Sequence, residues 1–391
     1  MNTRVKDRKY LGRSDPADLE IVRSEGNYLV DADGAKYIDF VMGWCVGNIG
    51  WGNKAVFDRI RKFKGPAYVN PGYLYRPWAE LAGLLAEITP GNLVKSFRAT
   101  GGTEAVEIAL QAAMAYTKRH KFLSIEGSYH GHSIAAMSIG DSGFRHWYRN
   151  LLLGCYKIRP PLDEKAAREA EKILRKGDIA AFIMEPIILN LGVIIPGKSF
   201  FDILLTACRE TGTLFIADEV ATGFGRTGRM FASEHFDLEP DMICLGKAIT
   251  GGYGGLGATV MTQEIAKSME FGFSFYSTFG WNPLNVDAAL ANIEHLIINK
   301  KKILKNTLEM SGYFEERLRN MSFRDPVELR IRGLAVCVEF GKAEYAAGIA
   351  RRCRSMGLLV SSGSAEITMF PALNIDKATA KKGLDIFEKC I

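Results

Sequence analysis

Short apolar segments alternate with helix-like segments along the chain from about residue 95. A segment with helical periodicity precedes an apolar, strand-like one three times: 105–120 before 121–127, 164–177 before 180–186, and 200–212 before 213–220. The apolar segments DMICLG and GLGATVMT follow. Strands that alternate with helices need right-handed crossovers, so the pattern predicts an α/β fold with a mostly parallel sheet covered on both faces.

The two ends of the chain predict a second, smaller unit. EGNYLVDADGAKYIDF near the N-terminus indicates a hairpin that turns at Asp33-Gly34. A long helical segment, NPLNVDAALANIEHLI, leads into a smaller α+β region that ends in a helix. We therefore expect a large α/β domain at 46–285 and a small α+β domain built from 1–45 and 286–391.

Composition excludes several classes of protein. The net charge of +6 over 391 residues is modest and scattered, so nothing indicates a nucleic-acid partner. The seven cysteines are odd in number and widely spaced, which favours a reduced, cytoplasmic protein over a disulfide framework. The N-terminal segment lacks the apolar core of a secretory signal, and no apolar stretch is long enough to span a membrane.

The segment LFIADEVATGFGRTG contains a G-x-G-x-x-G pattern directly after a strand-like run. A dinucleotide site needs an apolar helix after the third glycine, but Gly228 is followed by RMFASEHFDLEPD, which has no helical periodicity. The glycines therefore indicate a loop. The acidic residues Asp218 and Glu219 at the strand end need another explanation, because ligands of open α/β sheets bind at such ends.

A second glycine motif indicates a phosphate site. Gly101, Gly102 and Thr103 directly precede an apolar-periodic helix. Small residues and a hydroxyl at a helix N-terminus can hold a phosphate, although the same residues could simply cap the helix.

IEGSYHGHS places Tyr129 and His130 just past another strand, where an aromatic ring could stack on a flat ligand. His130 and His132 form an H-x-H pair, but no third ligand lies nearby in the sequence, so we expect no metal.

Lys247 directly follows the apolar segment MICLG and is a further candidate site residue. A desolvated lysine is a candidate for Schiff-base chemistry, although a lysine in isolation more often extends to solvent. A phosphate site, a stacking aromatic ring, an amine and a carboxylate together suit pyridoxal 5'-phosphate. Asp218 would keep its ring nitrogen protonated, and Val220, on the same strand face, would pack under the ring.

These motifs resemble those of the class III (ω-amino acid) aminotransferases, which are fold type I pyridoxal phosphate-dependent transferases with a seven-stranded sheet. The resemblance runs from about Asp31 to Leu373, and its blocks are DADGAKYIDF, TGGTEAVE, GSYHGHS, IMEPI, NLGVIIPG, IADEVATGFGRTG, PDMICLGKAITGG, STFGWNP and IRGL.

The resemblance implies a role for each site residue. Lys247 forms the Schiff base and transfers the proton, Asp218 pairs with the ring nitrogen, and Tyr129 stacks on the ring with His130 beside it. Glu185 joins the hydrogen-bond network of the cofactor. Gly101, Gly102 and Thr103 bind the phosphate, and Thr278 reaches the phosphate of the neighbouring subunit, which implies a homodimer with its active site at the interface.

Departures from the family pattern concern the substrate. Many members have an arginine near the C-terminus that grips a carboxylate, and a glutamate that pairs with it; Thr368 and Asn190 stand at these positions. Losing both charges together leaves neither one buried and unpaired. Trp44 resembles a pocket-lining tryptophan of amine-accepting members, and Ala221 replaces a glutamine that lies near the phenolic oxygen of the cofactor.

The sequence therefore predicts a transaminase that moves an amino group from an ω-amino acid, diamine or amino-sugar type of amine to a keto acid by a ping-pong mechanism. An aminomutase resembling glutamate-1-semialdehyde aminomutase, a racemase of the same family and a non-catalytic regulator remain as alternatives. Arg226 and Arg76 are the candidates for binding the keto-acid carboxylate.

Overall fold

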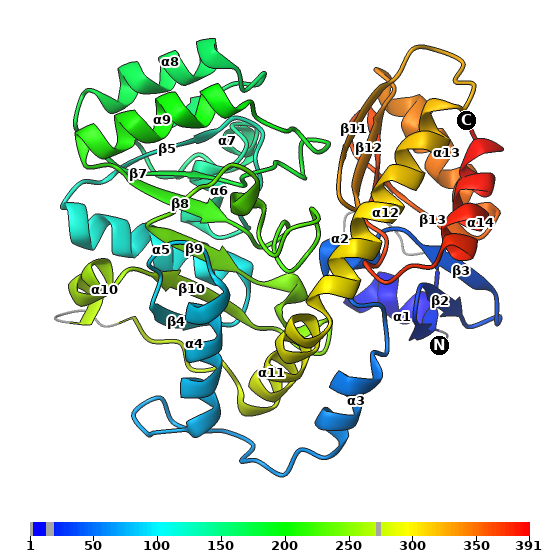
Figure 1. Cartoon of the computed structure of the whole chain (residues 1–391), viewed down its shortest axis with the longest axis horizontal. Helices are drawn as coiled ribbons and strands as arrows, with labels where there is room; N and C mark the ends of the chain where they lie inside the picture. The colour runs from blue at the N-terminus through cyan, green and yellow to red at the C-terminus, as the bar shows by residue number, and fades with distance from the viewer. Residues whose placement is uncertain (1–2, 13–18, 271–274) are drawn as a thin grey trace.

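A seven-stranded sheet forms the centre of the part of the chain described in the computed structural model, residues 3–12, 19–270 and 275–391 (Figure 1). Its spatial order is β4-β10-β9-β8-β7-β5-β6, and of these strands β10 alone runs antiparallel to its neighbours. The predicted α/β fold with a mostly parallel sheet is confirmed, but β4 and β6 are not among the strands identified from the sequence. The strands are β4 (Lys95–Ala99), β5 (Lys121–Ile125), β6 (Cys155–Ile158), β7 (Ile179–Met184), β8 (Leu214–Asp218), β9 (Met242–Leu245) and β10 (Gly257–Met261).

Helices bury both faces of this sheet. Alternate residues of β7 belong to different apolar clusters: Phe182 and Met184 pack with α9 (Lys198–Thr211) and α8 (Glu164–Leu174), whereas Ile183 packs with α5 (Gly102–Thr117). Successive strand side chains point to opposite faces, so a strand covered on both sides reads as a continuous apolar run.

Segments from the N-terminal and C-terminal parts of the chain lie together beside the central sheet (Figure 1). Strand β13 (Leu358–Leu359) pairs in parallel with β3 (Lys36–Asp39), which forms the predicted hairpin with β2 (Tyr28–Asp31), and β1 (Ile21–Glu25) completes that sheet. A third sheet holds β11 (Glu328–Arg332), β12 (Ala335–Glu339), β15 (Glu366–Met369) and β14 (Ser361–Ser362). The proposed domain boundaries stay a prediction.

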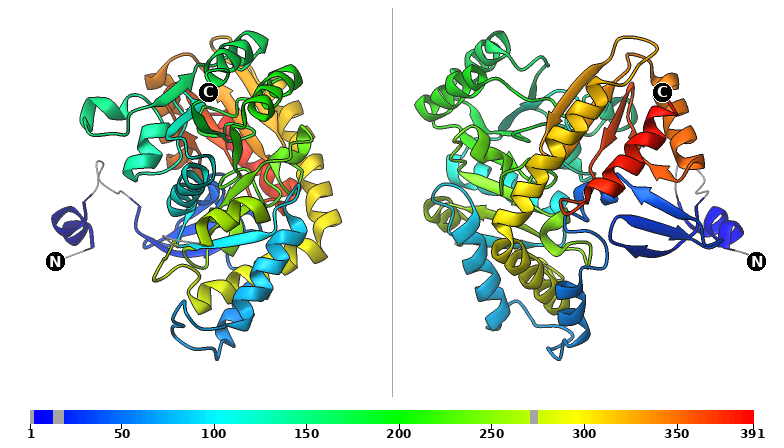
Figure 2. Two further views of the ribbon diagram at one scale, coloured as in Figure 1. Left: turned by 90° about the vertical axis from the view of Figure 1, so that its left-hand side faces the viewer. Right: turned by 45° about the vertical axis from the view of Figure 1, so that its right-hand side comes forward.

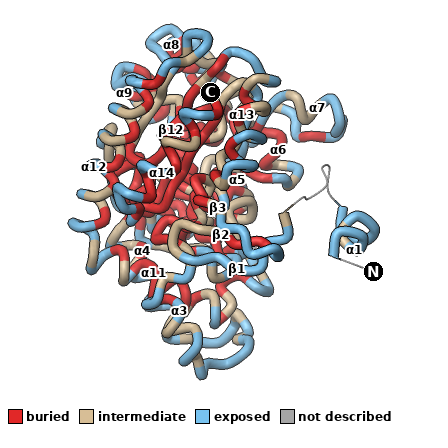
Figure 3. The backbone as a smooth tube through the Cα atoms, turned by 90° about the vertical axis from the view of Figure 1, so that its right-hand side faces the viewer, coloured by how far each residue is buried: buried red, intermediate tan, exposed pale blue. Residues whose placement is uncertain are grey.

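The remaining helices pack around these sheets, except for the N-terminal one, α1, which stands away from the body and is exposed (Figures 2 and 3). Part of the N-terminal segment, for which we predict no signal, lies outside the described residues. Among the described helices, none is both long and apolar enough to cross a membrane. Their bounds are α1 (Thr3–Tyr10), α2 (Met42–Cys45), α3 (Lys54–Arg61), α4 (Arg76–Ile88), α6 (Ile134–Ile139), α7 (Phe144–Trp147), α10 (Gln263–Glu270), α11 (Pro283–Ile298), α12 (Lys300–Arg319), α13 (Ala343–Ser355) and α14 (Lys377–Glu388), with 3₁₀ turns η1 (Ala232–His235) and η2 (Lys247–Thr250).

The glycine-rich loop after β8 packs against the C-terminal part of the chain. Gly225 has φ +94°, and a Cβ there would lie 2.7 Å from the Leu373 Cδ1 atom; Gly228 has φ +89°, with the Leu308 Cδ2 atom 2.8 Å from its would-be Cβ. The 3₁₀ turn η1, rather than an α-helix, follows the loop. The glycines thus serve a close approach of the loop to its neighbours, and the loop lacks the helix that a dinucleotide site requires.

Candidate active site

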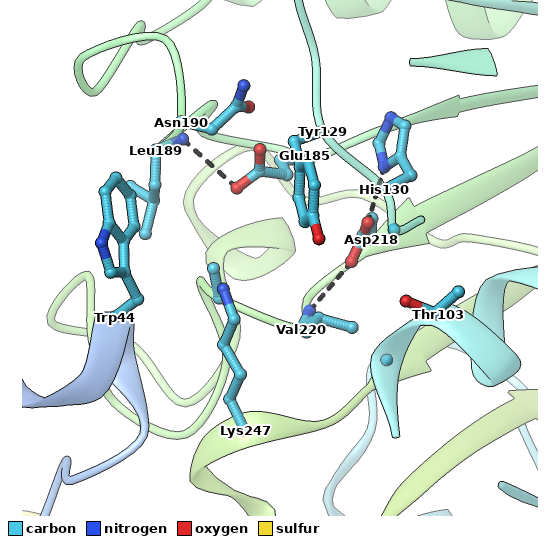
Figure 4. Close-up of a pocket in the computed structure, with 13 residues that line it drawn as sticks. Trp44, Thr103, Tyr129, His130, Glu185, Leu189, Asn190, Asp218, Val220 and Lys247 are labelled. Carbon is cyan, nitrogen blue, oxygen red and sulfur yellow. Dashed lines mark hydrogen bonds and ion pairs between the residues drawn. The ribbon is translucent and has the colours of Figure 1, made fainter. Parts of the chain in front are cut away.

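The carboxyl ends of the central strands bring most of the predicted residues together around one cavity of about 530 Å³ (Figure 4). Asp218 ends β8, Glu185 follows β7, Lys247 follows β9 and Tyr129 follows β5. Parallel strands end at the same edge, so residues far apart in sequence meet there. The lining residues are Trp44, Gly102, Thr103, Tyr129, His130, Gly131, Glu185, Leu189, Asn190, Asp218, Val220, Ala221 and Lys247.

Asp218 is a buried carboxylate held by two groups of the chain. The Nδ1 atom of His130 lies 2.6 Å from its Oδ2 atom, and the Val220 backbone N–H donates to its Oδ1 atom at 3.1 Å. The two fixed contacts orient the carboxyl group. The other ring nitrogen of His130, Nε2, is buried and has no partner within the described residues.

Lys247 extends into the cavity from a strained backbone. Its φ of +44° lies in the left-handed region, which costs a side-chain-bearing residue roughly 1–3 kcal/mol. A Cβ on the preceding Gly246 would lie 3.2 Å from the Gly102 nitrogen, so this loop lies close to the N-terminus of α5. Figure 4 shows the lysine ammonium group entering the space between Trp44 and Val220.

The N-terminus of α5 forms an open cradle on the opposite side of the cavity. Gly101 is the extended cap residue, and a Cβ on Gly102 would lie 2.7 Å from the Val220 Cγ1 atom. A Cβ on Gly131 would overlap the Thr103 side chain. Glycine at these positions therefore leaves room where backbone N–H groups and the Thr103 hydroxyl can hold an anion.

Tyr129 lines the cavity, and the nearby His130 and His132 have different partners. The Tyr129 side chain is 43% exposed, and its hydroxyl lies 2.9 Å from the Nδ1 atom of His132. The H-x-H pair is thus divided: His130 contacts Asp218, whereas His132 contacts Tyr129. The predicted stacking of Tyr129 on a cofactor ring stays a prediction.

Trp44 reaches the cavity from a left-handed turn in α2. Met42, Trp44 and Cys45 have φ values of 47°, 58° and 65°. This left-handed conformation costs a residue with a side chain about 1–2 kcal/mol. The Trp44 ring packs at 5.2 Å, centroid to centroid, against Phe370. The turn therefore places a large apolar ring on the cavity wall, and nothing in the sequence pattern indicates this conformation.

Glu185 is buried in the cavity wall with one carboxylate oxygen engaged. Its Oε2 atom accepts from the Leu189 backbone N–H at 3.3 Å, whereas its Oε1 atom has no partner within the described residues. Burial, together with the negative charge of Asp218, raises the pKa of Glu185 to about 8. Asn190 lies next to it and donates through Nδ2 to the Gly127 carbonyl at 2.9 Å.

Two predicted residues, Thr368 and Thr278, lie away from this cavity. Thr368 is buried on β15 opposite Cys337, outside the described cavity wall. Thr278 is exposed and also lies off the wall.

Neither arginine candidate reaches the cavity. Arg76 is exposed and pairs with Glu80 on its own helix, and Arg226 is fully buried. The Arg226 guanidinium donates to the carbonyls of Leu334 and Pro371, at 2.8 and 2.6 Å, and to Asn48 Oδ1 at 2.6 Å. Both terminal nitrogens of Arg226 are thus engaged by the C-terminal part of the chain and by Asn48, so its burial does not favour a carboxylate-binding role, which stays a prediction.

A second cavity of about 620 Å³ adjoins the first, and Tyr129 and Asn190 line both. Four acidic residues line it together with a single cationic one among its described lining residues, Arg330. Arg330 is already paired with Glu339 and Glu328, so the surplus charge at this cavity is negative. The acidic residues are Glu126, Asp141, Glu339 and Glu366.

The first cavity fits pyridoxal phosphate by the chemistry of its groups. The glycine cradle can take the phosphate, a buried carboxylate can pair with a protonated ring nitrogen, and an amine can form a Schiff base with the aldehyde. Two buried polar atoms, His130 Nε2 and Glu185 Oε1, lack partners within the described residues and leave hydrogen-bonding capacity at this wall.

Fold and site together define a pyridoxal phosphate-dependent enzyme of fold type I. Residues 10–391 match the aminotransferase class III family, so the chain belongs to that family, is an aminotransferase and uses pyridoxal phosphate. It is 33% identical to a putrescine aminotransferase of Pectobacterium atrosepticum, over 93% of this chain and 81% of that protein. It is also 33% identical to an acetylornithine aminotransferase of Archaeoglobus fulgidus, over 94% of each. The solved ω-transaminase of Pseudomonas jessenii in complex with PMP superposes with a TM-score of 0.93 at 25% identity, over 100% of this chain and 97% of that one.

Proposed function

We propose that this aminotransferase moves the amino group of a primary amine to a keto acid in two half-reactions, with Lys247 as the reacting amine. The observation that carries the proposal is the convergence of Lys247 and Asp218 on the cavity that also contains the α5 cradle. When bound, pyridoxal phosphate supplies an electron sink that stabilises negative charge on the substrate carbon.

The residues around the cavity have distinct proposed roles. Asp218, fixed by His130, holds a proton on the ring nitrogen, and Lys247 is displaced by the substrate amine and then moves a proton at the substrate carbon. Gly101, Gly102 and Thr103 bind the phosphate. Val220 and Tyr129 pack on the two faces of the ring.

A diamine is the substrate class that the charges favour most among ω-amino acids, diamines and amino sugars. Lys247 is the only cationic side chain with a fixed positive charge among the described lining residues of the first cavity, and it is the reacting group. The adjoining cavity carries the acidic excess at Glu126, Asp141 and Glu366. A second ammonium group is attracted there, whereas a carboxylate is repelled. Similarity to a putrescine aminotransferase supports the same choice.

A panel of amines tests this proposal. Putrescine, a monoamine of equal length, an ω-amino acid and an amino sugar are each assayed with pyruvate and with 2-oxoglutarate. We expect kcat/KM for putrescine to exceed that for the monoamine by about ten-fold or more, the effect of one desolvated charge pair of about 1.4 kcal/mol. Glu366→Gln should reduce this ratio and leave the monoamine unaffected. Equal rates for both amines contradict the diamine assignment.

An aminomutase is the second candidate, because it also suits the neutral Thr368 and Asn190. It rearranges one substrate and needs no keto acid. Turnover that continues without any keto acid would therefore support the aminomutase, whereas the transaminase stops after one amine equivalent per site.

The enzyme is proposed to act as a homodimer in which Thr278 completes the partner's phosphate site. Apolar rings cluster in the exposed region around Thr278: Tyr276 and Phe279 are 59% and 63% exposed, and Tyr68 packs on Phe279 at 6.1 Å. An exposed apolar patch of this kind favours a protein interface.

Mixed dimers test the role of Thr278. Lys247→Ala chains are inactive, and Thr278→Ala chains should bind the cofactor more weakly. If Thr278 acts across the interface, mixing the two variants restores one intact site per heterodimer and activity rises. Activity that does not rise on mixing contradicts the shared site.

The predicted cytoplasmic location is part of the proposal. The seven cysteines are free, as suits a reducing compartment. Cell fractionation measures it directly, and recovery of the enzyme outside the cytoplasm contradicts it.

A further inference from the structure

The buried carboxyl group of Glu185 has one oxygen that the chain leaves unused. The side chain is 4% exposed, and its Oε2 atom accepts from the backbone N–H of Leu189. Its Oε1 atom is buried and has no partner within the described residues. A buried polar atom without a partner destabilises the empty site, so a bound molecule that supplies a partner is favoured.

The charges around Glu185 favour its protonated form. Asp218 is the nearby negative group, Lys247 is the nearby positive one, and the thiol of Cys45 lies close on α2. In a Schiff base with the cofactor, the Lys247 nitrogen shares its proton with the negatively charged phenolic oxygen, which offsets the positive charge that favours an ionised Glu185. Burial and Asp218 then remain, and both hold the pKa of this carboxyl above its ordinary value.

In a protonated Glu185 the hydrogen must lie on Oε1, because Oε2 is the acceptor for Leu189. The hydroxyl then needs an acceptor, and no described residue places one within hydrogen-bond distance of Oε1. Leu189, Trp44 and Ala221 of the same wall have side chains that accept no strong hydrogen bond, and the Asn190 amide oxygen, itself without a partner among the described residues, makes no hydrogen bond with Glu185. The acceptor therefore has to come from the molecule in the cavity.

The position of Glu185 selects the acceptor on that molecule. Figure 4 shows its carboxyl group on the side of the cavity facing Trp44 and Leu189, away from Thr103. On the pyridine ring of the cofactor, the phosphate arm and the phenolic oxygen flank the aldehyde carbon on opposite sides. A phosphate in the α5 cradle thus turns the phenolic oxygen toward the wall that contains Glu185.

We propose that the protonated carboxyl group of Glu185 donates a hydrogen bond through Oε1 to the phenolic oxygen of bound pyridoxal phosphate. The inference rests on the proposed placement of phosphate at the α5 cradle and of Lys247 at the aldehyde. It gives this chain a donor at a site where Ala221, with only a methyl group, offers none. Glu185 is thus a cofactor-binding residue that tunes the proton between Lys247 and the phenolic oxygen.

Absorbance titration of the holoenzyme tests the proposal. The pKa of the bound chromophore reports the proton shared by the Lys247 nitrogen and the phenolic oxygen. A donor from Glu185 stabilises the form that has lost this proton. Glu185→Ala should therefore raise the chromophore pKa by about one unit, the effect of one hydrogen bond to a charged acceptor. Glu185→Gln keeps an N–H donor of similar shape and should stay within about half a unit of the wild type.

If Glu185 were ionised, its substitution would lower the chromophore pKa, because its negative charge would stabilise the protonated form of the chromophore. A chromophore pKa that falls in both Glu185→Ala and Glu185→Gln overturns the inference and leaves the transaminase proposal intact. If neither the wild-type protein nor Lys247→Ala shows a visible cofactor absorption band, both the inference about Glu185 and the transaminase proposal are overturned. Asp237→Asn removes a carboxylate from an exposed position and serves as the control, with an unchanged chromophore pKa.

Discussion

Replacing Arg226 by methionine should destabilise the protein without a direct effect on substrate binding. The guanidinium is fully buried and donates to two backbone carbonyls and to Asn48, so the substitution leaves three acceptors without their charged donor. A buried acceptor left without its donor costs about 1–3 kcal/mol, and the three acceptors share one relaxing pocket, so we expect a loss of about 3–5 kcal/mol in total.

This free energy converts into a melting temperature. An unfolding entropy of about 2.1 cal/mol/K per residue over 391 residues gives about 0.8 kcal/mol/K, so Tm should fall by about 4–6 °C. Scanning calorimetry of the cofactor-free protein measures the shift. Arg229→Met makes the same change at an exposed position of the same loop and should move Tm by less than about 1 °C.

Two results refute this reasoning. A Tm for Arg226→Met equal to that of Arg229→Met means that the buried hydrogen bonds do not link the loop to its neighbours. An unchanged Tm with a KM for the keto acid raised many-fold returns Arg226 to the carboxylate-binding role that its buried position does not favour.

Four further substitutions test the site. Gly131→Ala should weaken cofactor affinity by about ten-fold or more, because the new Cβ displaces Thr103, and a fluorescence titration measures the Kd. Trp44→Ala should shift the ratio of kcat/KM values between bulky and small amines by about ten-fold; an unchanged ratio contradicts its place on the substrate wall. Asp218→Asn should retain bound cofactor and lose at least about 100-fold in kcat, since an amide does not stabilise a protonated ring nitrogen. The pKa of Glu185 is about 8 in the folded chain, against an ordinary value of 4.5, so between these pH values the folded chain keeps a proton that the unfolded chain releases. The free energy of unfolding therefore falls as pH rises from 4.5 to 8. Glu185→Gln should make this free energy less dependent on pH, as measured by urea denaturation at about pH 5 and about pH 8.

The sequence predicted what local patterns encode. Apolar runs of strand length and helical periodicity identified the βα units, and the Asp33-Gly34 turn identified the hairpin. The position of Asp218 at a strand end, and of Lys247 at the end of the next strand, was enough to expect them at one sheet edge. These predictions rest on short-range rules that tertiary packing did not override.

Other features depend on contacts between distant residues, which no local pattern contains. His130 meets Asp218 across 88 positions, and Arg226 meets Pro371 across 145. The left-handed turn at Trp44 cannot be recognised from the sequence, because three of its residues, Met42, Trp44 and Cys45, are not glycine. β6 was missed since its segment, CYKI, is short and bears a lysine.

The left-handed turn that carries Trp44 has a consequence for how this enzyme could change its substrate. The reacting lysine and the carboxylate for the ring nitrogen sit on the rigid edge of the central sheet, whereas the tryptophan comes from an N-terminal segment whose neighbouring strand pairs with a strand from the C-terminal part. Under the proposed roles, reaction chemistry and amine selection are carried by different pieces of the chain. Variants in the segment around residues 41–46 can explore new amines while the chemical machinery stays untouched.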